Sequence, residues 1–306
     1  MYLGFDTSNY TTSVALFDGK EIYQQKKLLT VKSGERGLRQ SDAVFQHTVN
    51  LPLLLEKTNV NFDKINAVAV SSRPRNIDGS YMPCFLVGEA NAVSVSRFCK
   101  APIYKTSHQI GHILAALYSV NRLDLIKEKF IAFHISGGTT EALFVTPDND
   151  EIIKAERVAC STDLKAGQAI DRAGVMMGFD FPCGKELDRL SLNSKREFKI
   201  KPSMNGMNCS LSGIENKAKQ MFEKGESRED ISKFVLSSVS AALEQMTEKI
   251  LNEYGNLPLV FAGGVMSNNL IRKNITSKFE AYFAQPEFSC DNAAGIAIYA
   301  YLKDNR

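Results

Sequence analysis

Hydrophobic and polar positions follow the same succession twice along this chain. In each copy a buried strand runs into a small polar turn, and a hairpin of two further strands follows. We predict these strands at residues 2–6, 14–17 and 21–29 in the first copy, and at residues 130–135, 142–145 and 151–158 in the second. The repetition indicates an internal duplication, with each copy opening one domain. The expected domains are residues 1–125 and 126–306.

Helical and extended segments alternate through the rest of the chain, and two of the helices have clear start signals. Ser227 begins a capping box that opens a long amphipathic helix to about residue 253. Pro52 is expected to interrupt a helix at residues 46–57. Further helices are predicted at residues 84–98, 113–127 and 167–177 and near residues 267 and 291, and further strands at residues 65–70, 102–104 and 257–262.

The polar turns of the two copies are built from Gly, Ser and Thr, which let backbone amides and hydroxyls approach an anion closely. The second turn is Ser136-Gly137-Gly138-Thr139-Thr140. Taken alone, each turn is better explained as an ordinary hairpin turn rich in turn-forming residues. Two matching copies favour the actin, Hsp70 and sugar-kinase (ASKHA) architecture, a duplicated α/β fold of two lobes. In that architecture a nucleotide-like ligand lies in the interdomain cleft.

Composition places the chain among globular proteins of about two domains. It has 306 residues, a formal net charge of +3 and six cysteines without a Cys-x-x-Cys pair, which argues against a zinc ribbon or a disulfide scaffold. The N-terminal residues lack the features of a signal peptide, and no long apolar run is present, so we expect a cytoplasmic protein without membrane contact. The basic run at residues 195–201 could meet phosphates, but the overall charge is too weak to demonstrate nucleic-acid binding.

Two of the four histidines, His108 and His112, are four residues apart and follow Ser107, a good N-cap. On a helix that spacing places both imidazoles on one face, which is half of a metal site. Asp291, at the start of the last predicted helix, is the candidate third ligand, although it could equally be an N-cap aspartate. A zinc protease needs Glu directly after the first His, and Gln109 stands there, so a metalloprotease is disfavoured.

Candidate ligand-binding residues also follow the second turn. Residues 161–188 contain carboxylates that could meet ribose hydroxyls or a metal, or simply face solvent, and the pair Gly263-Gly264 lies between a strand and a helix start, where a ligand can approach the backbone. The candidates in these segments are Asp163, Asp171, Gly184, Asp188, Gly263 and Gly264.

Together these motifs, spread over almost the whole chain, resemble the TsaD family. The resemblance rests on His108-x3-His112, residues 136–141 (Ser-Gly-Gly-Thr-Thr-Glu), Gly263-Gly264-Val265-x2-Asn268-x3-Arg272 and residues 291–294 (Asp-Asn-Ala-Ala). TsaD proteins transfer a threonylcarbamoyl group to a tRNA adenosine next to the anticodon. The resemblance implies an acyltransferase in which His108, His112 and Asp291 bind one divalent metal ion, iron or zinc. It further implies that the turn at residues 136–140, Asp171, Gly184 and Asn268 hold the threonylcarbamoyl-adenylate.

The resemblance also implies partners: a smaller TsaB-like paralogue, a TsaE-like ATPase and a separate enzyme that makes the adenylate. The sequence departs from the family in the first turn, where an acidic pair is replaced by Tyr10 and Thr11 within the run Asp6-Thr7-Ser8-Asn9-Tyr10-Thr11-Thr12. Two alternatives therefore stay open, a paralogue that binds nucleotide or adenylate without catalysis and one with an altered acceptor. The third alternative is a sugar-kinase-like phosphotransferase that binds ATP or ADP. In such a mechanism the two histidines and the aspartate have no obvious role.

Overall fold

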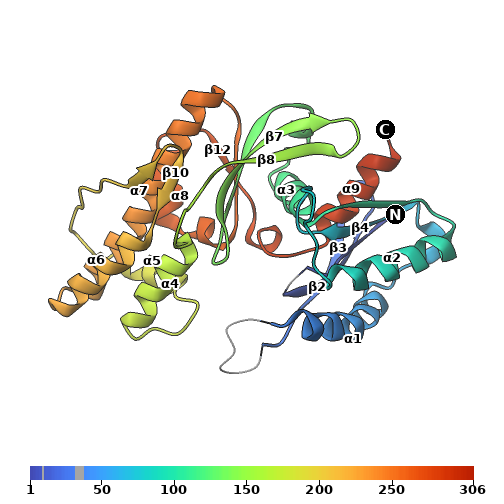
Figure 1. The fold of residues 1–306 in the computed structure, drawn as a ribbon, viewed down its shortest axis with the longest axis horizontal. Coiled ribbons are helices and arrows are strands. Elements are labelled where there is room, and N and C mark those ends of the chain that lie inside the picture. The colour runs from blue at the N-terminus through green and yellow to red at the C-terminus, as the bar shows by residue number, and fades with distance from the viewer. Residues whose placement is uncertain (9, 32–37) are drawn as a thin grey trace. The chain divides into compact units, whose positions relative to one another are not determined.

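The structure, a computed structural model, describes residues 1–8, 10–31 and 38–306, so that Asn9 of the first turn lies outside the described residues (Figure 1). The chain forms two compact units. The first comprises Met1–Glu128, Thr146–Ala155 and Glu287–Arg306, and the second comprises Lys129–Val145 and Glu156–Pro286. The predicted division at residue 125 is close to the first boundary, but it wrongly assigns residues 146–155 and 287–306 to the second domain.

The sheet of the first unit has the strand order β3-β2-β1-β4-β5. β1 pairs antiparallel with β2 and parallel with β4, which in turn is parallel to β5. β1 and β2 are buried along their whole length, including the polar residues Thr11, Thr12 and Ser13 at the start of β2. The strands are β1 (Tyr2–Asp6), β2 (Thr11–Phe17), β3 (Ile22–Leu28), β4 (Ala67–Arg73) and β5 (Ile103–Ser107).

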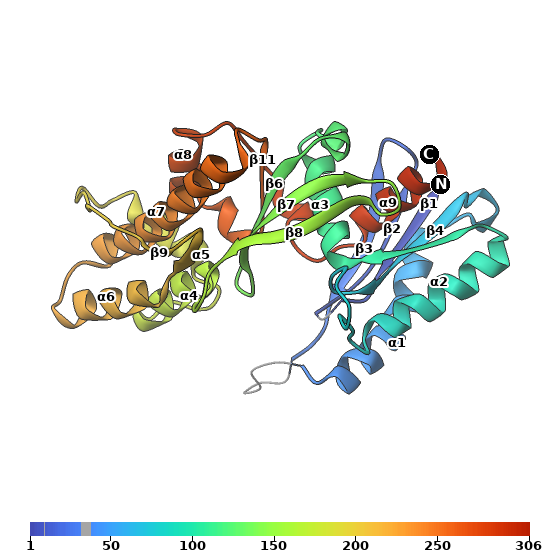
Figure 2. The ribbon, with the colours of Figure 1, turned by 45° about the horizontal axis from the view of Figure 1, so that its top comes forward.

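Helices cover both faces of this sheet. Figures 1 and 2 show α1 (Gln40–Thr58) and α2 (Phe85–Cys99) on one side of the strands, and α9 (Ala294–Asp304) on the other side beside α3 (His108–Ser119). Leu51 and Leu54 of α1 join Leu3 and Phe5 of β1 in the core. Because this packing holds the helix from both sides of Pro52, α1 is continuous there, and the predicted interruption is wrong.

Three glycines allow α9 to lie very close to its neighbours. A Cβ on Gly4 of β1 would be 2.4 Å from the backbone nitrogen of Ala297, and one on Gly295 of α9 would be 1.8 Å from the backbone oxygen of Gly111 in α3. Such distances admit no side chain at either position. The last helix is therefore locked onto β1 and α3, which explains why the C-terminal segment belongs to the first unit.

The second unit repeats the strand arrangement of the first, with the order β12-β11-β6-β7-β8. β6 pairs antiparallel with β7 and parallel with β11, just as β1 does with β2 and β4. The structure thus confirms the duplication that the hydrophobic pattern predicts. The strands are β6 (Phe130–Ile135), β7 (Thr140–Asp148), β8 (Ile152–Cys160), β11 (Leu259–Ala262) and β12 (Ala281–Phe283), and β9 (Ser203–Asn205) forms a separate hairpin with β10 (Asn208–Ser210).

The core of the second unit lies between its sheet and the long helix α7 (Arg228–Tyr254). Ser227 caps this helix as predicted, because its side chain accepts a hydrogen bond from the Asp230 amide at 3.1 Å. Rings from β6, β11 and β12 stack in the core, with 4.3 Å between the centroids of Phe133 and Phe261. The other helices are α4 (Ala166–Met176), α5 (Gly184–Ser191), α6 (Ser212–Glu223) and α8 (Asn269–Thr276).

Two further details complete the comparison with the sequence pattern. The helix that Ser107 is expected to start and the helix predicted at residues 113–127 are one element, α3, which runs from His108 to Ser119. Leu123–Lys127 then forms a separate 3₁₀ turn, so the predicted end at residue 127 is too late. No helix within the described ranges combines the length and the apolar character needed to cross a membrane.

Candidate functional site

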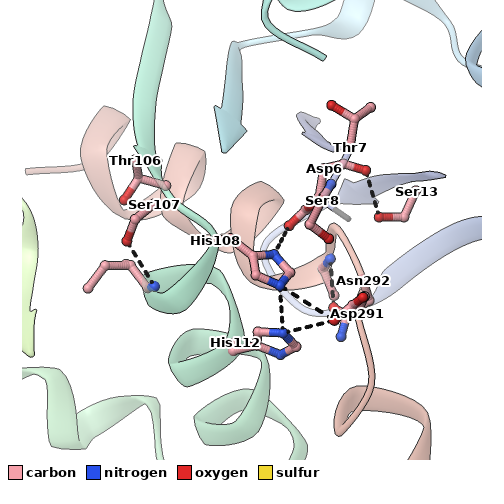
Figure 3. Close-up of polar contacts among 12 residues, drawn as sticks. Asp6, Thr7, Ser8, Ser13, Thr106, Ser107, His108, His112, Asp291 and Asn292 are labelled. Carbon is pink, nitrogen blue, oxygen red and sulfur yellow. Dashed lines mark hydrogen bonds and ion pairs between the residues drawn. The ribbon is translucent and has the colours of Figure 1, made fainter. Parts of the chain in front are cut away.

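The two histidines lie in the first two turns of α3, which follows β5 directly. The Ser107 hydroxyl accepts a hydrogen bond from the Ile110 amide at 3.3 Å, so the predicted N-cap is confirmed and the strand passes into the helix without a loop. The Nε2 atoms of His108 and His112 are 2.9 Å apart, and their ring centroids are separated by 4.3 Å. Both imidazoles therefore present a nitrogen to the same point (Figure 3).

Asp291 reaches this point from the turn before α9. Its Oδ1 atom lies 3.2 Å from Nε2 of His112 and 3.4 Å from Nε2 of His108. The neighbouring Asn292 satisfies the helix start, since its side-chain oxygen accepts from the Ala294 amide at 3.0 Å. The N-cap alternative for Asp291 is thus wrong, and its carboxylate is available to the histidines.

The crossing of α3 and α9 sets the separation of these side chains. Gly111 lies one residue before His112, and Gly295 lies four residues after Asp291. At this crossing the backbone of α3 leaves no room for a Cβ on Gly295, and a Cβ on Gly111 would be 2.6 Å from the end of the Ile296 side chain. A rigid helix pair, rather than a loop, therefore positions the three side chains.

Asp6, the last residue of β1, supports the cluster from behind. Its side chain is 1% exposed, and Oδ2 lies 2.6 Å from Nδ1 of His108, while Oδ1 accepts from the Ser8 amide at 2.8 Å. A carboxylate that accepts a hydrogen bond from Nδ1–H fixes the ring and leaves Nε2 as the free ligand atom, as is usual for histidines that bind metals. Figure 3 shows Asp6 and Asp291 at opposite nitrogens of the His108 ring.

The arrangement fits a divalent transition-metal ion. The three ligand atoms, two imidazole nitrogens and one carboxylate oxygen, lie within 4.8 Å of one another. Ligands about 2.1 Å from one tetrahedral or octahedral ion lie about 3 to 3.5 Å apart, as these atoms do. Side-chain exposures of 12% for His112 and 30% for Asp291 leave the cluster open to solvent on one side.

Electrostatics at the cluster also favour a cation. Burial lowers the pKa of His108, but the carboxylates of Asp6 and Asp291 outweigh it and raise that pKa to about 10. Burial raises the pKa of Asp291, yet its hydrogen bonds to His108 and His112 bring the pKa well below the usual value. The two carboxylates therefore attract a positive charge, which a proton on an imidazole or a metal ion can supply.

In the second unit, the turn between β6 and β7 is held by its own side chains. The Ser136 amide donates to the Thr139 carbonyl at 2.7 Å, and the Thr139 amide donates to the Ser136 hydroxyl at 3.1 Å. The Thr140 hydroxyl accepts from the Ala166 amide at 2.9 Å and so joins the turn to α4. A Cβ on Gly137 or Gly138 would meet no atom within 4 Å, which leaves space beside the backbone of these two residues.

Gly263 and Asn268 lie at the two ends of the short segment between β11 and α8. Gly263 has a φ of 102°, and a Cβ there would be 2.2 Å from the Ile135 oxygen, so only glycine fits. Gly264 has open space instead. The Asn268 side-chain oxygen caps α8 through the Ile271 amide, while its buried Nδ2 atom has no partner within the described residues.

Three further candidates lie on α4 and α5. Asp171 accepts from the Cys183 amide at 2.8 Å, and burial raises the pKa of its carboxyl group. Gly184 begins α5 with open space at its Cα. One carboxylate oxygen of Asp188 accepts from Asn269, while the buried Oδ1 atom has no partner among the residues described. Asp188 and Asn268 thus bring an acceptor and a donor, both unsatisfied, to adjoining elements, which is a place for a polar ligand.

The model of the family described as TsaD, tRNA N6-adenosine threonylcarbamoyltransferase, matches residues 26–298 of this chain. The chain belongs to the TsaD family. Similar members are the tRNA N6-adenosine threonylcarbamoyltransferases of Thermosipho africanus and Ligilactobacillus salivarius. They are 30% and 29% identical to this chain over 98% of its length, and the aligned regions cover 93% and 90% of the relatives.

Solved structures confirm the ASKHA fold of this TsaD-family chain. Component A of the (R)-2-hydroxyglutaryl-CoA dehydratase of Acidaminococcus fermentans matches 100% of the chain and 99% of its own length, with a TM-score of 0.58 and 17% identity. A putative N-acetylmannosamine kinase from Listeria monocytogenes matches 100% of both chains with a TM-score of 0.53 and 12% identity. At such identities the likeness shows the fold alone.

Sequence reasoning named the three clustered residues of this TsaD-family chain but missed the role of Asp6. A carboxylate that ends a fully apolar strand and precedes a Thr-Ser turn was the available signal, because a buried charge needs a partner. The sequence could not name that partner, since His108 is 102 residues away.

Proposed function

We propose that this protein transfers a threonylcarbamoyl group from a carbamoyl-adenylate to N6 of a tRNA adenosine. The observation that carries the proposal is the convergence of His108, His112 and Asp291 on one point in a chain of the TsaD family. A sugar kinase needs a carboxylate close to a transferred phosphate and has no use for such a set. The His-His-Asp cluster therefore separates this proposal from a phosphotransferase on the same fold.

In this proposal His108, His112 and Asp291 hold one iron or zinc ion. When bound, the ion supplies Lewis-acid chemistry that stabilises negative charge on an acyl oxygen. Asp6 keeps the proton of His108 on Nδ1 and thereby directs Nε2 into the cluster.

The second unit would hold the adenylate. Its candidate contacts are the open turn at residues 136–140, Asp171, Gly184, Asp188, the pair Gly263-Gly264 and Asn268. The unsatisfied Oδ1 of Asp188 can accept from a ribose hydroxyl, and Nδ2 of Asn268 can donate to the ligand. In the reaction, N6 of adenosine forms a bond to the carbamoyl carbon and loses a proton. The bond from that carbon to the phosphate oxygen breaks, and AMP leaves.

We also propose, from the family resemblance, that the protein works with a smaller TsaB-like paralogue and a TsaE-like ATPase. The test is a reconstituted reaction with these partners, adenylate and tRNA, in which mass spectrometry measures threonylcarbamoyladenosine and elemental analysis measures bound metal. We expect about one ion per chain, and H112A and D291A should each lose the ion and about 1,000-fold in rate, consistent with several kcal/mol for such an ion. Asp304→Ala, an exposed residue of α9, is the matched control.

Three outcomes would contradict parts of the proposal. If both variants bind as much metal as the wild type, His112 and Asp291 do not hold the ion. Adenylate that binds but is not consumed would indicate a non-catalytic paralogue. Consumption of adenylate without tRNA modification would indicate a different acceptor.

A further inference from the structure

A cavity of about 320 Å³ lies in the second unit, away from the candidate turns. Its apolar lining comes from the start of α6 and one face of α7, including Leu211, Ile214 and Phe234. Its polar rim comes from the segment before β9, with Lys199 and Lys201, and from Ser203, the first residue of β9. Such a volume is at the lower end of the range for small-ligand pockets and suits one nucleotide-sized group.

The charge at the rim is not neutralised within the protein. Residues 195–201 contain four cationic side chains and only one carboxylate. Arg196 pairs with Glu226 at 2.5 Å, and that one carboxylate, Glu197, pairs with Lys233 at 2.8 Å. Lys199 and Lys201 are exposed and have no hydrogen-bond or ion-pair partner within the described part of the chain. Two cations therefore border an apolar lining, which complements a phosphate attached to a base.

The start of α6 does not provide the anion contact. Asp163 already occupies it, accepting from the Ser210 hydroxyl at 2.5 Å and from the amides of Leu211 and Ser212. Burial raises the pKa of Asp163, but these hydrogen bonds lower it far below the usual value, so the helix amides face a carboxylate. Recognition of a phosphate at this cavity depends on the two lysines.

The same aspartate links the cavity to the open turn between β6 and β7. The loop that carries Asp163 begins at Ser161, whose amide donates to the Thr140 carbonyl at 2.9 Å. It ends at Ala166, whose amide donates to the Thr140 hydroxyl. One hydrogen-bonded loop thus joins the cavity to the proposed adenylate turn, so a ligand in the cavity is held in a fixed relation to it.

We propose that this cavity binds an unpaired nucleotide of the tRNA substrate, with its base against Phe234 and Ile214 and its phosphate on Lys199 and Lys201. Proteins commonly recognise single-stranded RNA in this way, through a cationic rim and an aromatic or apolar platform. The inference rests on the proposed function, because that function makes tRNA the substrate. It assigns the second unit an RNA contact in addition to its adenylate turns.

The test measures the affinity of the full chain for unmodified tRNA by fluorescence anisotropy over a range of salt concentrations. K199A combined with K201A should weaken binding about tenfold and reduce the salt slope by about 1.4, the value for two single-stranded phosphate contacts. Phe234→Leu should weaken binding at least about fivefold through lost stacking and leave the slope unchanged. K224A combined with K273A, two exposed lysines elsewhere in the unit, is the control of equal charge.

An affinity and slope of the double variant equal to those of the control would overturn the proposal. An equal loss toward duplex RNA of random sequence would also overturn it, because it would show a general electrostatic effect. Metal content and adenylate binding should stay unchanged in all variants. The assay needs no transfer reaction, so a failure of the proposed function would appear as absent modification despite intact tRNA binding.

Discussion

The two turns that follow β1 and β6 occupy equivalent places in the duplicated fold, yet they are built differently. The first is tied to the start of α2 through Thr7, whose hydroxyl donates to the Cys84 carbonyl at 3.0 Å and accepts from the Gly88 amide at 3.1 Å. The second leaves Gly137 and Gly138 open. One sheet arrangement thus supports a cluster of His108, His112 and Asp291 in one unit and an accessible backbone turn in the other.

The difference shows that the duplication preserves the strand order but not the chemistry. β1 ends in Asp6, which orients a histidine, whereas β6 ends in Ile135, which contributes no charge. We expect substitutions around the first turn to affect stability and metal binding. Substitutions in the second should affect ligand binding and leave the fold intact.

The largest effect should come from Gly295→Ala, which closes the space at the crossing of α3 and α9. The new Cβ would overlap the Gly111 oxygen, so the helices must separate, and we expect the free energy of unfolding to fall by about 3 kcal/mol. Chemical denaturation measures this change, and bound metal should decrease with it. Gly213→Ala, where a Cβ meets nothing within 4 Å, should be neutral or slightly stabilising; equal losses in both variants would contradict the close packing.

A comparable loss of folding stability is expected on acidification, because of His47 beneath the first turn. This ring is fully buried and its Nδ1 lies 2.8 Å from the Thr12 hydroxyl, and burial lowers its pKa from 6.5 to about 4, against the opposing influence of Asp6. The folded state therefore binds fewer protons than the unfolded state between pH 6.5 and 4. Stability should be fully present above pH 6.5 and fall by about 3 kcal/mol as the pH drops to 4.

Denaturation of the wild type and of His47→Gln at several pH values measures this contribution. The difference between the two proteins should grow smaller toward pH 4, because the variant lacks the titrating ring. A difference that stays constant across this pH range would show that His47 is not held neutral in the folded protein.

Asp6→Asn is expected to have a smaller effect, which should appear in metal affinity. An amide can donate to Nδ1 of His108 and so favour the tautomer with the proton on Nε2, which cannot bind a metal. Metal affinity, measured by competition with a chelator, should fall about 10- to 100-fold, as for other residues that orient metal-binding histidines. Adenylate binding by the second unit should not change, and a loss of both would show that Asp6 supports the whole fold instead.

The smallest effect on stability is expected from Gly137→Ala in the second turn. Since no atom lies within 4 Å of the new Cβ, the free energy of unfolding should change by less than about 0.5 kcal/mol. The methyl group would nevertheless occupy space beside the backbone, and calorimetry should show adenylate affinity falling about tenfold, or about 1.4 kcal/mol. Unchanged affinity would indicate that the ligand does not approach this turn.

Local signals predicted much of this structure. The alternation of apolar strands and small-residue turns gave both hairpins, Ser107 gave the start of α3, and the spacing of His108 and His112 gave two members of the cluster. Each of these depends on a few neighbouring residues, whose propensities act within one turn or strand.

The features that sequence reasoning missed depend on distant contacts. Pro52 lies inside a continuous helix because packing of α1 on the sheet outweighs the helix-breaking tendency of proline. The helix α9 joins the first unit because Gly4, Gly111 and Gly295 have no side chains that would keep it away from β1 and α3. Local sequence could not decide whether Asp291 caps the last helix, because that depends on where the helix begins. The structure begins α9 at Ala294, whose amide donates to Asn292. The roles of the residues in the second unit stay predictions.

The placement of Asp291 also has a consequence for biosynthesis. His108 and His112 emerge from the ribosome long before their third companion, and a nascent chain that stops short of residue 291 contains only two of the three donors. The proposed metal site is therefore complete only after translation of the final segment and its docking against α3.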